Sequence, residues 1–333
     1  MKKNILIIRA GMLGDVLMTT PLVHAIRKRY PQAKICYLVG DWSKEILKGN
    51  KDIDLIITFD DSIIFEKRLF KVLALIRRLR KERFDLCFIL DKSYLWNIFA
   101  FLAGAKERIG FNRGKEGFLN TKNIDFSASK YELDYYLDIA KLIGIEEETD
   151  MNIELSGEDK KFAEKKIKEG TIGIAAGGAD NPGQSFTLKR WPLEKYIALI
   201  KKLNKDTALF GGKGDIKVSK EIDNKTDATN LTGKLTIQQT AACIKRCSLF
   251  IAHDSGLMHL AAAVKTPVIA LFGPTPAKRF APKHSVVIKS HLRCSPCYDI
   301  YGNYKRCEKA KCMESISVGE VESAIHKVLK TPR

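Results

Sequence analysis

The sequence predicts an α/β protein with two Rossmann-like domains, each built on a doubly wound parallel sheet. Short β-branched and apolar runs alternate with amphipathic segments along most of the 333 residues. Such alternation requires parallel strands with helices on both sheet faces. The length exceeds one domain of roughly 100–200 residues. An acidic, helix-breaking stretch at residues 145–157 interrupts the alternation, so we expect domains at 1–150 and 151–315, facing a cleft, and a terminal helical segment at 316–333.

The elements of the first domain are expected to follow a strand–helix order. Its strands are predicted at residues 5–8, 34–39, 53–59 and 85–90. The helical segments after them are predicted up to residue 30 and at 41–47, 66–81 and 94–103. This βαβ series favours a Rossmann-like domain.

The second domain repeats the alternation after residue 170. Its strands are predicted at residues 171–176, 207–210, 248–252 and 267–272. Its helices are predicted at residues 193–202, 215–224 and 236–246. A last helix at 318–329 has no strand after it, and we expect it to pack back on the first domain.

The charge balance favours anionic partners. Lys and Arg number 57 against 39 Asp and Glu, a net charge of +18 that is spread along the chain. Nucleotides, phosphosugars, nucleic acids and acidic membrane surfaces all suit this balance. The longest apolar run, residues 94–105, is too short to span a bilayer, and no signal-peptide cleavage site follows the N-terminal strand. We therefore expect a cytoplasmic protein.

A first motif follows the strand at 5–8, where α/β proteins place ligands. It contains Arg9, Gly11, Gly14 and Asp15, and we expect Asp15 to face the cleft. Gly11 and Gly14 match two positions of a dinucleotide-binding fingerprint, but Arg9 occupies the first glycine position. The structural alternative is a tight turn with Asp15 as a helix cap.

A second motif surrounds the last two predicted strands. Its candidate ligand-binding residues are Asp254, Ser255, Gly256, His259, Gly273 and Thr275. The helix that opens after Asp254 presents free N–H groups, which suit a pyrophosphate. His259 lies four residues after Ser255, on the same helical face. The alternative for this histidine is a packed or surface residue.

Two glycine-rich loops follow the other strands of the second domain. The candidate phosphate donors and nucleoside contacts in these loops are Ser185, Thr187, Lys189, Gly212 and Asp215. We expect Arg190 to be a solvated surface charge and Trp191 to anchor a helix in the core.

The cysteines near the C-terminus could form a zinc site. Cys294, Cys297, Cys307 and Cys312 have the paired spacing of four tetrahedral thiolate ligands. Reduced structural thiols are the alternative in a cytoplasmic protein. The pair Asp52 and Asp54 precedes a strand instead of following one, so we do not expect it to hold a metal.

Together these motifs resemble glycosyltransferase family 9, the ADP-heptose:lipopolysaccharide heptosyltransferases. The matching segments are residues 9–21, 189–192, 211–212, 254–259 and 271–275. The resemblance implies a GT-B fold with the acceptor bound by the first domain and ADP-heptose by the second. It implies inverting transfer without a required metal or cofactor, with Asp15 as the base and Lys189 at the departing ADP. Arg9, Gly11 and Gly14 would join Asp15 on the acceptor side. Asp215 stands where the family often carries a Glu.

The resemblance also implies partners and a location. The acceptor would be the anionic lipid A and core oligosaccharide, reached at the inner face of the cytoplasmic membrane. The basic segment at residues 69–83 could assist by attracting anionic lipid.

Two other functions compete with this one. A nicotinamide-dependent oxidoreductase would explain Gly11, Gly14 and Asp41, although Arg9 opposes it. A basic nucleic-acid or zinc-binding protein would explain the charge and the four cysteines. No nucleic-acid-binding motif accompanies that charge, so we expect no nucleic-acid partner.

Overall fold

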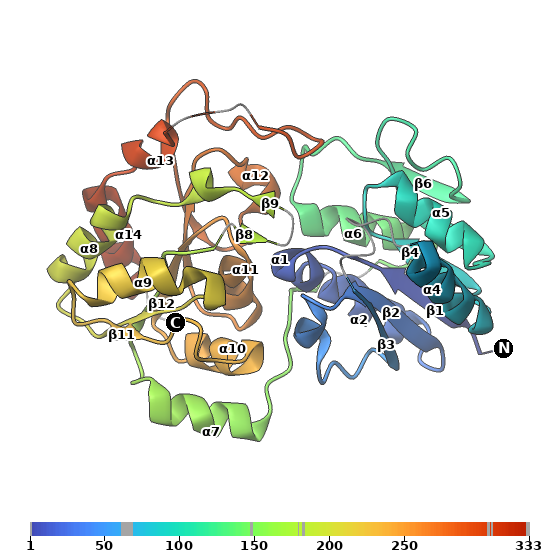
Figure 1. Ribbon diagram of the computed structural model, residues 1–333, viewed down its shortest axis with the longest axis horizontal. Helices are drawn as coiled ribbons and strands as arrows, with labels where there is room; N and C mark the ends of the chain where they lie inside the picture. Colours follow the sequence, from blue (N-terminus) through green and yellow to red (C-terminus); the bar gives the residue numbers. More distant parts are fainter. Residues whose placement is uncertain are drawn as a thin grey trace. The chain divides into compact units, whose positions relative to one another are not determined.

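The protein consists of two α/β units (Figure 1). The computed structural model describes residues 2–60, 69–146, 149–178, 180–181, 184–304, 307 and 309–330. The units comprise Met1–Glu154 and Leu155–Arg333, so the division falls within the acidic stretch of the sequence. Each unit contains a six-stranded sheet in which neighbouring strands are parallel.

The first unit has the sheet order β3-β2-β1-β4-β5-β6. Its strands are β1 (Asn4–Ile8), β2 (Lys34–Gly40), β3 (Leu55–Phe59), β4 (Leu86–Ile89), β5 (Glu107–Asn112) and β6 (Lys122–Asp125). Its helices are α1 (Leu13–Leu17), α2 (Thr20–Arg29), the 3-10 helix η1 (Lys44–Leu47), α4 (Leu69–Lys81), α5 (Tyr94–Leu102) and α6 (Glu132–Lys141).

The second unit has the sheet order β11-β10-β7-β12-β13-β14. Its strands are β7 (Ile172–Ala175), β10 (Thr207–Leu209), β11 (Thr229–Asn230), β12 (Leu249–His253), β13 (Val268–Phe272) and β14 (Val286–Lys289), with the hairpin β8 (Asp180–Asn181) and β9 (Gln184–Ser185). Its α-helices are α7 (Gly157–Lys166), α8 (Leu193–Lys202), α9 (Ile216–Asp223), α10 (Ile237–Lys245), α11 (Gly256–Ala263), α12 (Ala277–Phe280), α13 (Lys311–Ser315) and α14 (Val318–Lys330). Two 3-10 turns are η2 (Thr187–Lys189) and η3 (Lys213–Asp215).

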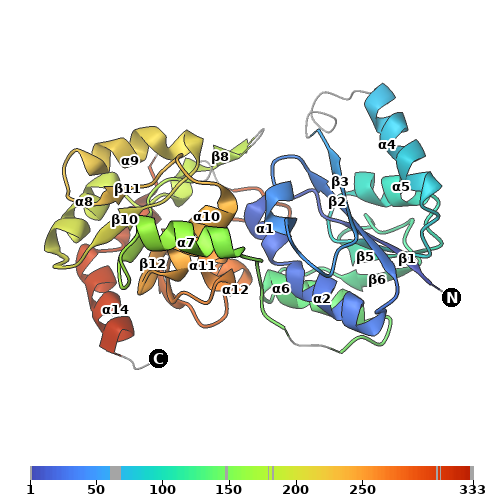
Figure 2. The ribbon, with the colours of Figure 1, turned by 90° about the horizontal axis from the view of Figure 1, so that it is seen from below.

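Both faces of the first sheet are covered. Figure 2 shows α4 and α5 on one face and α2 and α6 on the other. Leu6 and Ile8 of β1 share a buried core with Leu79 of α4 and Trp96 of α5. The interior strands β1, β2 and β4 are apolar without alternation because a sheet covered on both faces buries nearly all of their side chains.

The last helix, α14, packs within the second unit. Its buried residues Val321, Ala324 and Ile325 belong to the same core as Leu199 of α8 and Ile251 of β12. We expected this helix to pack on the first domain, but its apolar face is already occupied by the second.

Several predicted helix bounds need correction. The single helix expected up to residue 30 is two helices, α1 and α2, because Pro21 lacks a backbone N–H and sits in the first turn of α2. The helix expected at 41–47 is the shorter 3-10 turn η1. The helix expected at 66–81 is described from Leu69 onward, and residues 66–68 lie outside the described part of the chain.

Among the described residues, no helix combines the length and apolar character needed to cross a membrane.

Candidate functional site

The two sheets reverse their strand order at equivalent places. The reversal lies between β1 and β4 in the first sheet and between β7 and β12 in the second. Ligands of open α/β sheets bind beyond the carboxyl ends of the strands at such a reversal. The segments after these four strands therefore define a candidate site on each unit.

In the first unit, Arg9 pairs with two carboxylates. Its Nη2 atom lies 3.0 Å from Oδ1 of Asp15, and its Nη1 atom lies 2.5 Å from Oδ1 of Asp91. The second oxygen of Asp91 accepts a hydrogen bond from the Ala10 N–H at 2.7 Å. Arg9 is 8% exposed. Burial opposes its charge, but Asp15, Tyr136 and Asp91 outweigh burial and hold the Arg9 pKa well above its ordinary value.

Asp15 is the most accessible member of this network. Its side chain is 29% exposed, against 10% for Arg9 and 12% for Asp91. Its Oδ2 atom accepts a hydrogen bond from the Met12 N–H at 3.0 Å, so the predicted capping role is present as well. A side chain at Gly11 would place its Cβ 2.7 Å from Oδ2 of Asp15. Gly11 is thus needed to leave room for the carboxylate, while Gly14 is buried within α1.

A second buried ion pair lies behind this network. Lys92 pairs with Glu132 of α6, and their side chains are 8% and 2% exposed. The Lys92 ammonium also lies 4.4 Å from the ring centre of Phe126 and 5.7 Å from that of Tyr136. Glu132 accepts a hydrogen bond from the Tyr136 hydroxyl at 3.3 Å.

Four residues of this region are not among those predicted from the sequence: Asp91, Lys92, Glu132 and Tyr136. A signal for the first two was available, because they directly follow the predicted strand at 85–90, at the edge where ligands bind. No comparable signal existed for Glu132 and Tyr136, which lie in a region where no helix was predicted.

In the second unit, Lys189 pairs with Asp254 at 2.9 Å. The side chains are 20% and 8% exposed. Burial alone would raise the pKa of Asp254, but the Lys189 charge outweighs it and holds that pKa below its ordinary value. The Lys189 ammonium also lies 5.2 Å from the ring centre of Phe186, which stacks on Tyr298.

Asp215 connects the two glycine-rich loops. Its Oδ1 atom accepts from the Gly178 N–H at 2.5 Å, and its Oδ2 atom accepts from the Gly212 N–H at 2.8 Å. A Cβ at Gly177 would approach the Asp215 Cγ to 2.4 Å, so the glycine allows this contact. Both carboxylate oxygens thus bind backbone, and Asp215 positions the loops.

Arg190 and Trp191 have structural roles. The Arg190 guanidinium donates two hydrogen bonds to the Gly178 carbonyl, at 2.8 and 2.7 Å. This contact corrects the expectation of a solvated charge. Trp191 is 2% exposed and donates to the Ile316 carbonyl at 3.0 Å, as expected of a core anchor.

His253 and Ser255 present buried polar atoms to the same loop. His253 is fully buried, and neither of its ring nitrogens has a hydrogen-bond partner among the described residues; the same holds for the Ser255 Oγ atom. A Cβ built on Gly178 would lie 3.7 Å from Nε2 of His253 and 3.3 Å from Cβ of Ser255. Burial lowers the pKa of His253 to about 3, so the imidazole is neutral. Unsatisfied buried polar atoms are rare in folded proteins and suit a ligand.

The remaining predicted residues differ in their exposure. Ser185 and Thr187 are exposed, whereas His259 and Thr275 are 3% and 2% exposed. Gly256 begins α11. A Cβ at Gly273 would lie 2.6 Å from Sδ of Met313, so this glycine allows close packing of α13.

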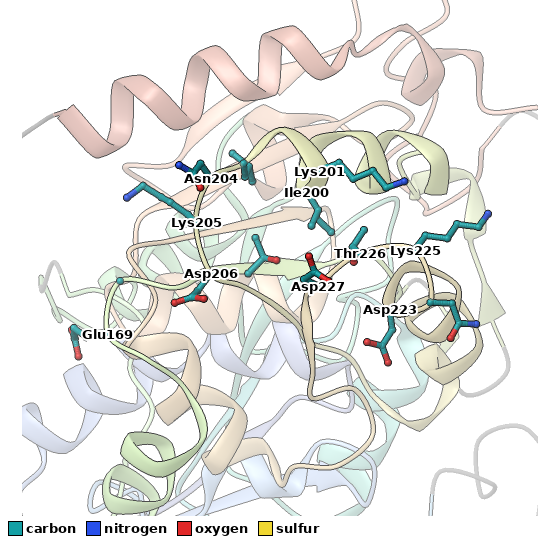
Figure 3. A pocket seen from close by; sticks show the side chains of 14 residues that line it. Glu169, Ile200, Lys201, Asn204, Lys205, Asp206, Asp223, Lys225, Thr226 and Asp227 are labelled. Carbon is teal, nitrogen blue, oxygen red and sulfur yellow. The ribbon is translucent and has the colours of Figure 1, made fainter.

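A hollow of about 1060 Å³ lies elsewhere on the second unit (Figure 3). It is lined in part by Gly170, Lys205 and Asp206, which precede β7 and β10, and by Thr207, the first residue of β10. This is the amino end of the strands, opposite the edge where ligands bind. The hollow is therefore separate from the candidate site.

The four predicted zinc ligands do not form a metal site in the described part of the chain, where no group of three or more His, Cys, Asp or Glu side chains could hold an ion. All four cysteines are free thiols, and burial raises the pKa of Cys312.

Two doubly wound units with charged sites at equivalent strand ends are the architecture of a GT-B glycosyltransferase. The model of one family, glycosyltransferase family 9 (heptosyltransferase), matches residues 72–307, and the chain belongs to this family. The protein is therefore a transferase. Family membership removes the reason for considering a nicotinamide-dependent oxidoreductase or a nucleic-acid-binding protein.

Similar proteins agree with this assignment. Lipopolysaccharide heptosyltransferase 2 of Escherichia coli K12 is 28% identical over 300 residues, covering 82% of this chain and 83% of the relative. A family 9 glycosyltransferase structure from Veillonella parvula has a TM-score of 0.81 at 23% identity, covering 98% of this chain and 97% of that one. The structure of E. coli ADP-heptose lps heptosyltransferase II has a TM-score of 0.78 at 23% identity, covering 99% and 98%.

Proposed function

We propose that this enzyme transfers a heptose from ADP-heptose to the lipopolysaccharide inner core or a related glycan, with inversion at the anomeric carbon. Family membership supports the heptose, and the names of the similar E. coli proteins support the donor and the acceptor. The observation that carries the proposal is the Arg9–Asp15–Asp91 network, which holds one accessible carboxylate at the end of β1.

In this proposal, Asp15 acts as the general base on the acceptor. It takes the proton of the acceptor hydroxyl while that oxygen forms a bond to the anomeric carbon of the heptose. The bond between the anomeric carbon and the ADP oxygen breaks, and its electrons leave with ADP. Arg9 keeps Asp15 oriented. The guanidinium of Arg9 is in turn held in place by Asp91, the second carboxylate with which it pairs.

The second unit would bind the donor and stabilise the charge on the departing ADP. Lys189 offers a cation, and the N-terminus of α11 offers N–H groups beside the unpartnered Ser255 hydroxyl. Fixed donors of this kind stabilise developing charge because they need no rearrangement during the reaction. His253 is neutral, so it would offer an N–H to the donor without adding charge. Asp215 would act indirectly, by holding the glycine-rich loops in place.

The same proposal includes a location and the chemical state of the cysteines. The acceptor is an anionic glycolipid, so the enzyme would work in the cytoplasm, peripherally at the inner membrane face. The net charge of +18 suits this acceptor. We expect no metal or cofactor requirement, with Cys294, Cys297, Cys307 and Cys312 as reduced thiols.

The test is ligand stabilisation followed by turnover. Thermal unfolding is measured with ADP, UDP, GDP and NAD, each with and without EDTA, because a ligand that binds the folded state raises its melting temperature. We expect stabilisation by ADP alone, unaffected by EDTA, and ADP release from ADP-heptose only when a core acceptor is added. Preferential stabilisation by UDP or GDP would contradict the proposed donor.

A further inference from the structure

We infer that the outer surface of α4 and α5 docks on an anionic lipid bilayer. This α4–α5 face consists of Phe70, Leu73, Tyr94, Leu95, Phe101 and Leu102 with the basic residues Lys71, Arg77, Arg78, Arg80 and Lys81. The inference rests on the proposed function, because it names the surface by which the enzyme would reach a membrane-held acceptor. The two helices contact each other and lie on the same side of the first sheet (Figure 2).

The apolar part of the face is a continuous stripe along α5. Tyr94, Leu95, Phe101 and Leu102 are 52%, 42%, 50% and 40% exposed. These positions have the spacing i, i+1, i+7 and i+8, which places them on one side of a helix. The opposite side of α5 is buried, since Trp96 is 6% exposed. The helix is therefore apolar on both sides. On the exposed side, the Arg108 guanidinium lies 5.4 Å from the ring centre of Phe101, and the four side chains still keep at least 40% of their surface exposed.

Helix α4 adds aromatic and basic side chains. Phe70 is 88% exposed and Leu73 is 43% exposed. Arg77 and Lys81 follow Leu73 at helical spacing and are exposed as well. Among the described residues, neither Arg77 nor Lys81 pairs with an acidic side chain, whereas Lys71 pairs with Asp60.

The charge pattern selects the kind of partner. Neither α4 nor α5 contains an acidic residue, as their sequences LFKVLALIRRLRK and YLWNIFAFL show. Helix α7, with the sequence GEDKKFAEKK, mixes both signs and has only one buried residue, as expected of a helix that faces water. Lys71 of this face pairs with Asp60 at 2.7 Å, so the excess positive charge comes from the other basic residues of α4. A surface that joins these residues to exposed aromatic side chains matches the headgroup and acyl-chain boundary of an anionic membrane.

The α4–α5 face also adjoins the candidate acceptor site. Helix α5 begins at Tyr94, three residues after Asp91 of the Arg9 network and two after Lys92. Its exposed stripe therefore starts at the carboxyl end of β4. A bilayer contacting this stripe would hold the sugar of a lipid-linked acceptor near Asp15.

Vesicle co-sedimentation of the full chain tests the inference. The probes are vesicles of phosphatidylcholine alone and of phosphatidylcholine with phosphatidylglycerol. We expect binding to the anionic vesicles only, weakened by salt. The variant Arg77→Gln/Arg78→Gln/Lys81→Gln should bind about a hundredfold more weakly, since each basic residue near such a surface contributes about fivefold. The variant Leu95→Ser/Phe101→Ser should bind the anionic vesicles about tenfold more weakly, because it removes apolar side chains that would enter the bilayer.

Matched controls change exposed basic or apolar residues elsewhere in the chain. Lys160→Gln/Lys161→Gln/Lys165→Gln removes exposed charges from α7, and Val286→Ser/Val287→Ser removes side chains of β14 that are 38% exposed. Both should bind anionic vesicles like the wild type. The inference would be overturned if the α4–α5 variants bound anionic vesicles as tightly as the wild type. It would also be overturned if the wild type formed a concentration-dependent dimer that only these variants abolish.

A second measurement separates this inference from the proposed function. With a detergent-solubilised acceptor, the α4–α5 variants should transfer heptose at the wild-type rate, because no residue of the Arg9 network is changed. Vesicle binding by an enzyme that transfers no heptose would support the docking face and contradict the proposed reaction. Heptose transfer by an enzyme that does not bind vesicles would support the proposed reaction and contradict the docking face.

Discussion

The two sheets of this enzyme have the same strand order but hold opposite chemistry at their ligand-binding ends. In the first unit the charged groups pair with one another, because Arg9 forms ion pairs with both Asp15 and Asp91 and leaves one carboxylate charge in excess. In the second unit, His253 and Ser255 present buried polar atoms that have no partner in the described part of the chain.

This difference separates a reactive group from a binding site. A base must keep its position and charge before the substrate arrives, so its supporting contacts belong to the protein. A donor site gains affinity when its buried N–H and O–H groups find their partner only on the ligand, because leaving them unpaired costs about 1–3 kcal/mol each. The comparison predicts that changes in the first unit affect turnover, whereas changes in the second affect nucleotide binding as well.

The largest effect is expected from Asp15→Asn. The amide cannot take a proton, so turnover should fall about 100- to 10,000-fold. Stabilisation by ADP should be unchanged, because the carboxylate belongs to the other unit. Steady-state kinetics measures the loss of turnover, and thermal unfolding with ADP measures the stabilisation by the nucleotide. Asp41→Asn changes an exposed aspartate after β2 and serves as the control. Near-normal turnover by Asp15→Asn would refute the assignment of the base.

Lys189→Met should weaken both binding and turnover. Loss of the cation should lower kcat/KM about a hundredfold and reduce ADP stabilisation. It also leaves Asp254, whose side chain is 8% exposed, without its partner, so the free energy of unfolding should fall by about 3 kcal/mol.

A double variant tests the origin of this instability. Lys189→Met/Asp254→Asn should recover most of the stability in urea unfolding, but none of the activity. Lys168→Met breaks an exposed pair with Asp206 at 3.3 Å and should leave stability unchanged. Full recovery of activity in the double variant would show that Lys189 acts only through Asp254.

Gly11→Ala should have a smaller effect on turnover. The new Cβ would lie 2.7 Å from Asp15 Oδ2 and 2.9 Å from Arg9 Cζ, so the carboxylate must move. We expect about a tenfold loss of kcat with unchanged ADP stabilisation, since small displacements of a catalytic group are costly. Gly214→Ala is the matched control, because among the described residues no atom other than those of Gly214, its chain neighbours and the backbone of its own helical turn lies within 4 Å of the new Cβ. Equal activity of the two variants would show that Asp15 tolerates displacement.

The interior of each sheet was predictable from sequence, but the edges were not. Central strands such as β1 and β12 are buried on both faces, and their continuous apolar runs are visible in the sequence. The edge strands β6 and β14 are largely exposed, so they have no such pattern, and β11 has only two residues. The sequence predicts no element over residues 104–141, although they form β5, β6 and α6. Exposure explains this for β6, but not for β5 and α6, which are largely buried.

The candidate site divides in the same way. Asp15, Lys189 and Asp254 follow strands or lie in glycine-rich loops, so local sequence is enough to propose them as site residues. Glu132 reaches Lys92 across 40 residues of sequence, and no local pattern encodes that contact. Asp215 was correctly assigned to a glycine-rich loop, but its bonds to two backbone N–H groups depend on how two loops meet.

The smallest effect at neutral pH is expected from replacing His253, which should instead change how the free energy of unfolding depends on pH in acid. Burial lowers its pKa to about 3 in the folded protein, whereas an unfolded chain has a histidine pKa of about 6.5. Between these values the unfolded state binds more protons, so stability should fall as pH decreases from 6.5 toward 3. At pH 5 the need to keep His253 neutral lowers the free energy of unfolding by about 2 kcal/mol.

The variant His253→Gln isolates this contribution. It should lose less stability than the wild type between pH 7 and pH 5 in urea unfolding, because glutamine does not titrate. His326→Gln changes an exposed histidine of α14 and should keep the wild-type pH dependence. ADP stabilisation of His253→Gln at pH 7 then shows whether the neutral imidazole also contacts the donor. If the two variants have identical pH profiles, His253 is not held neutral by burial. Equal stabilisation of His253→Gln and the wild type by ADP would show that the unpartnered nitrogens do not contact the donor.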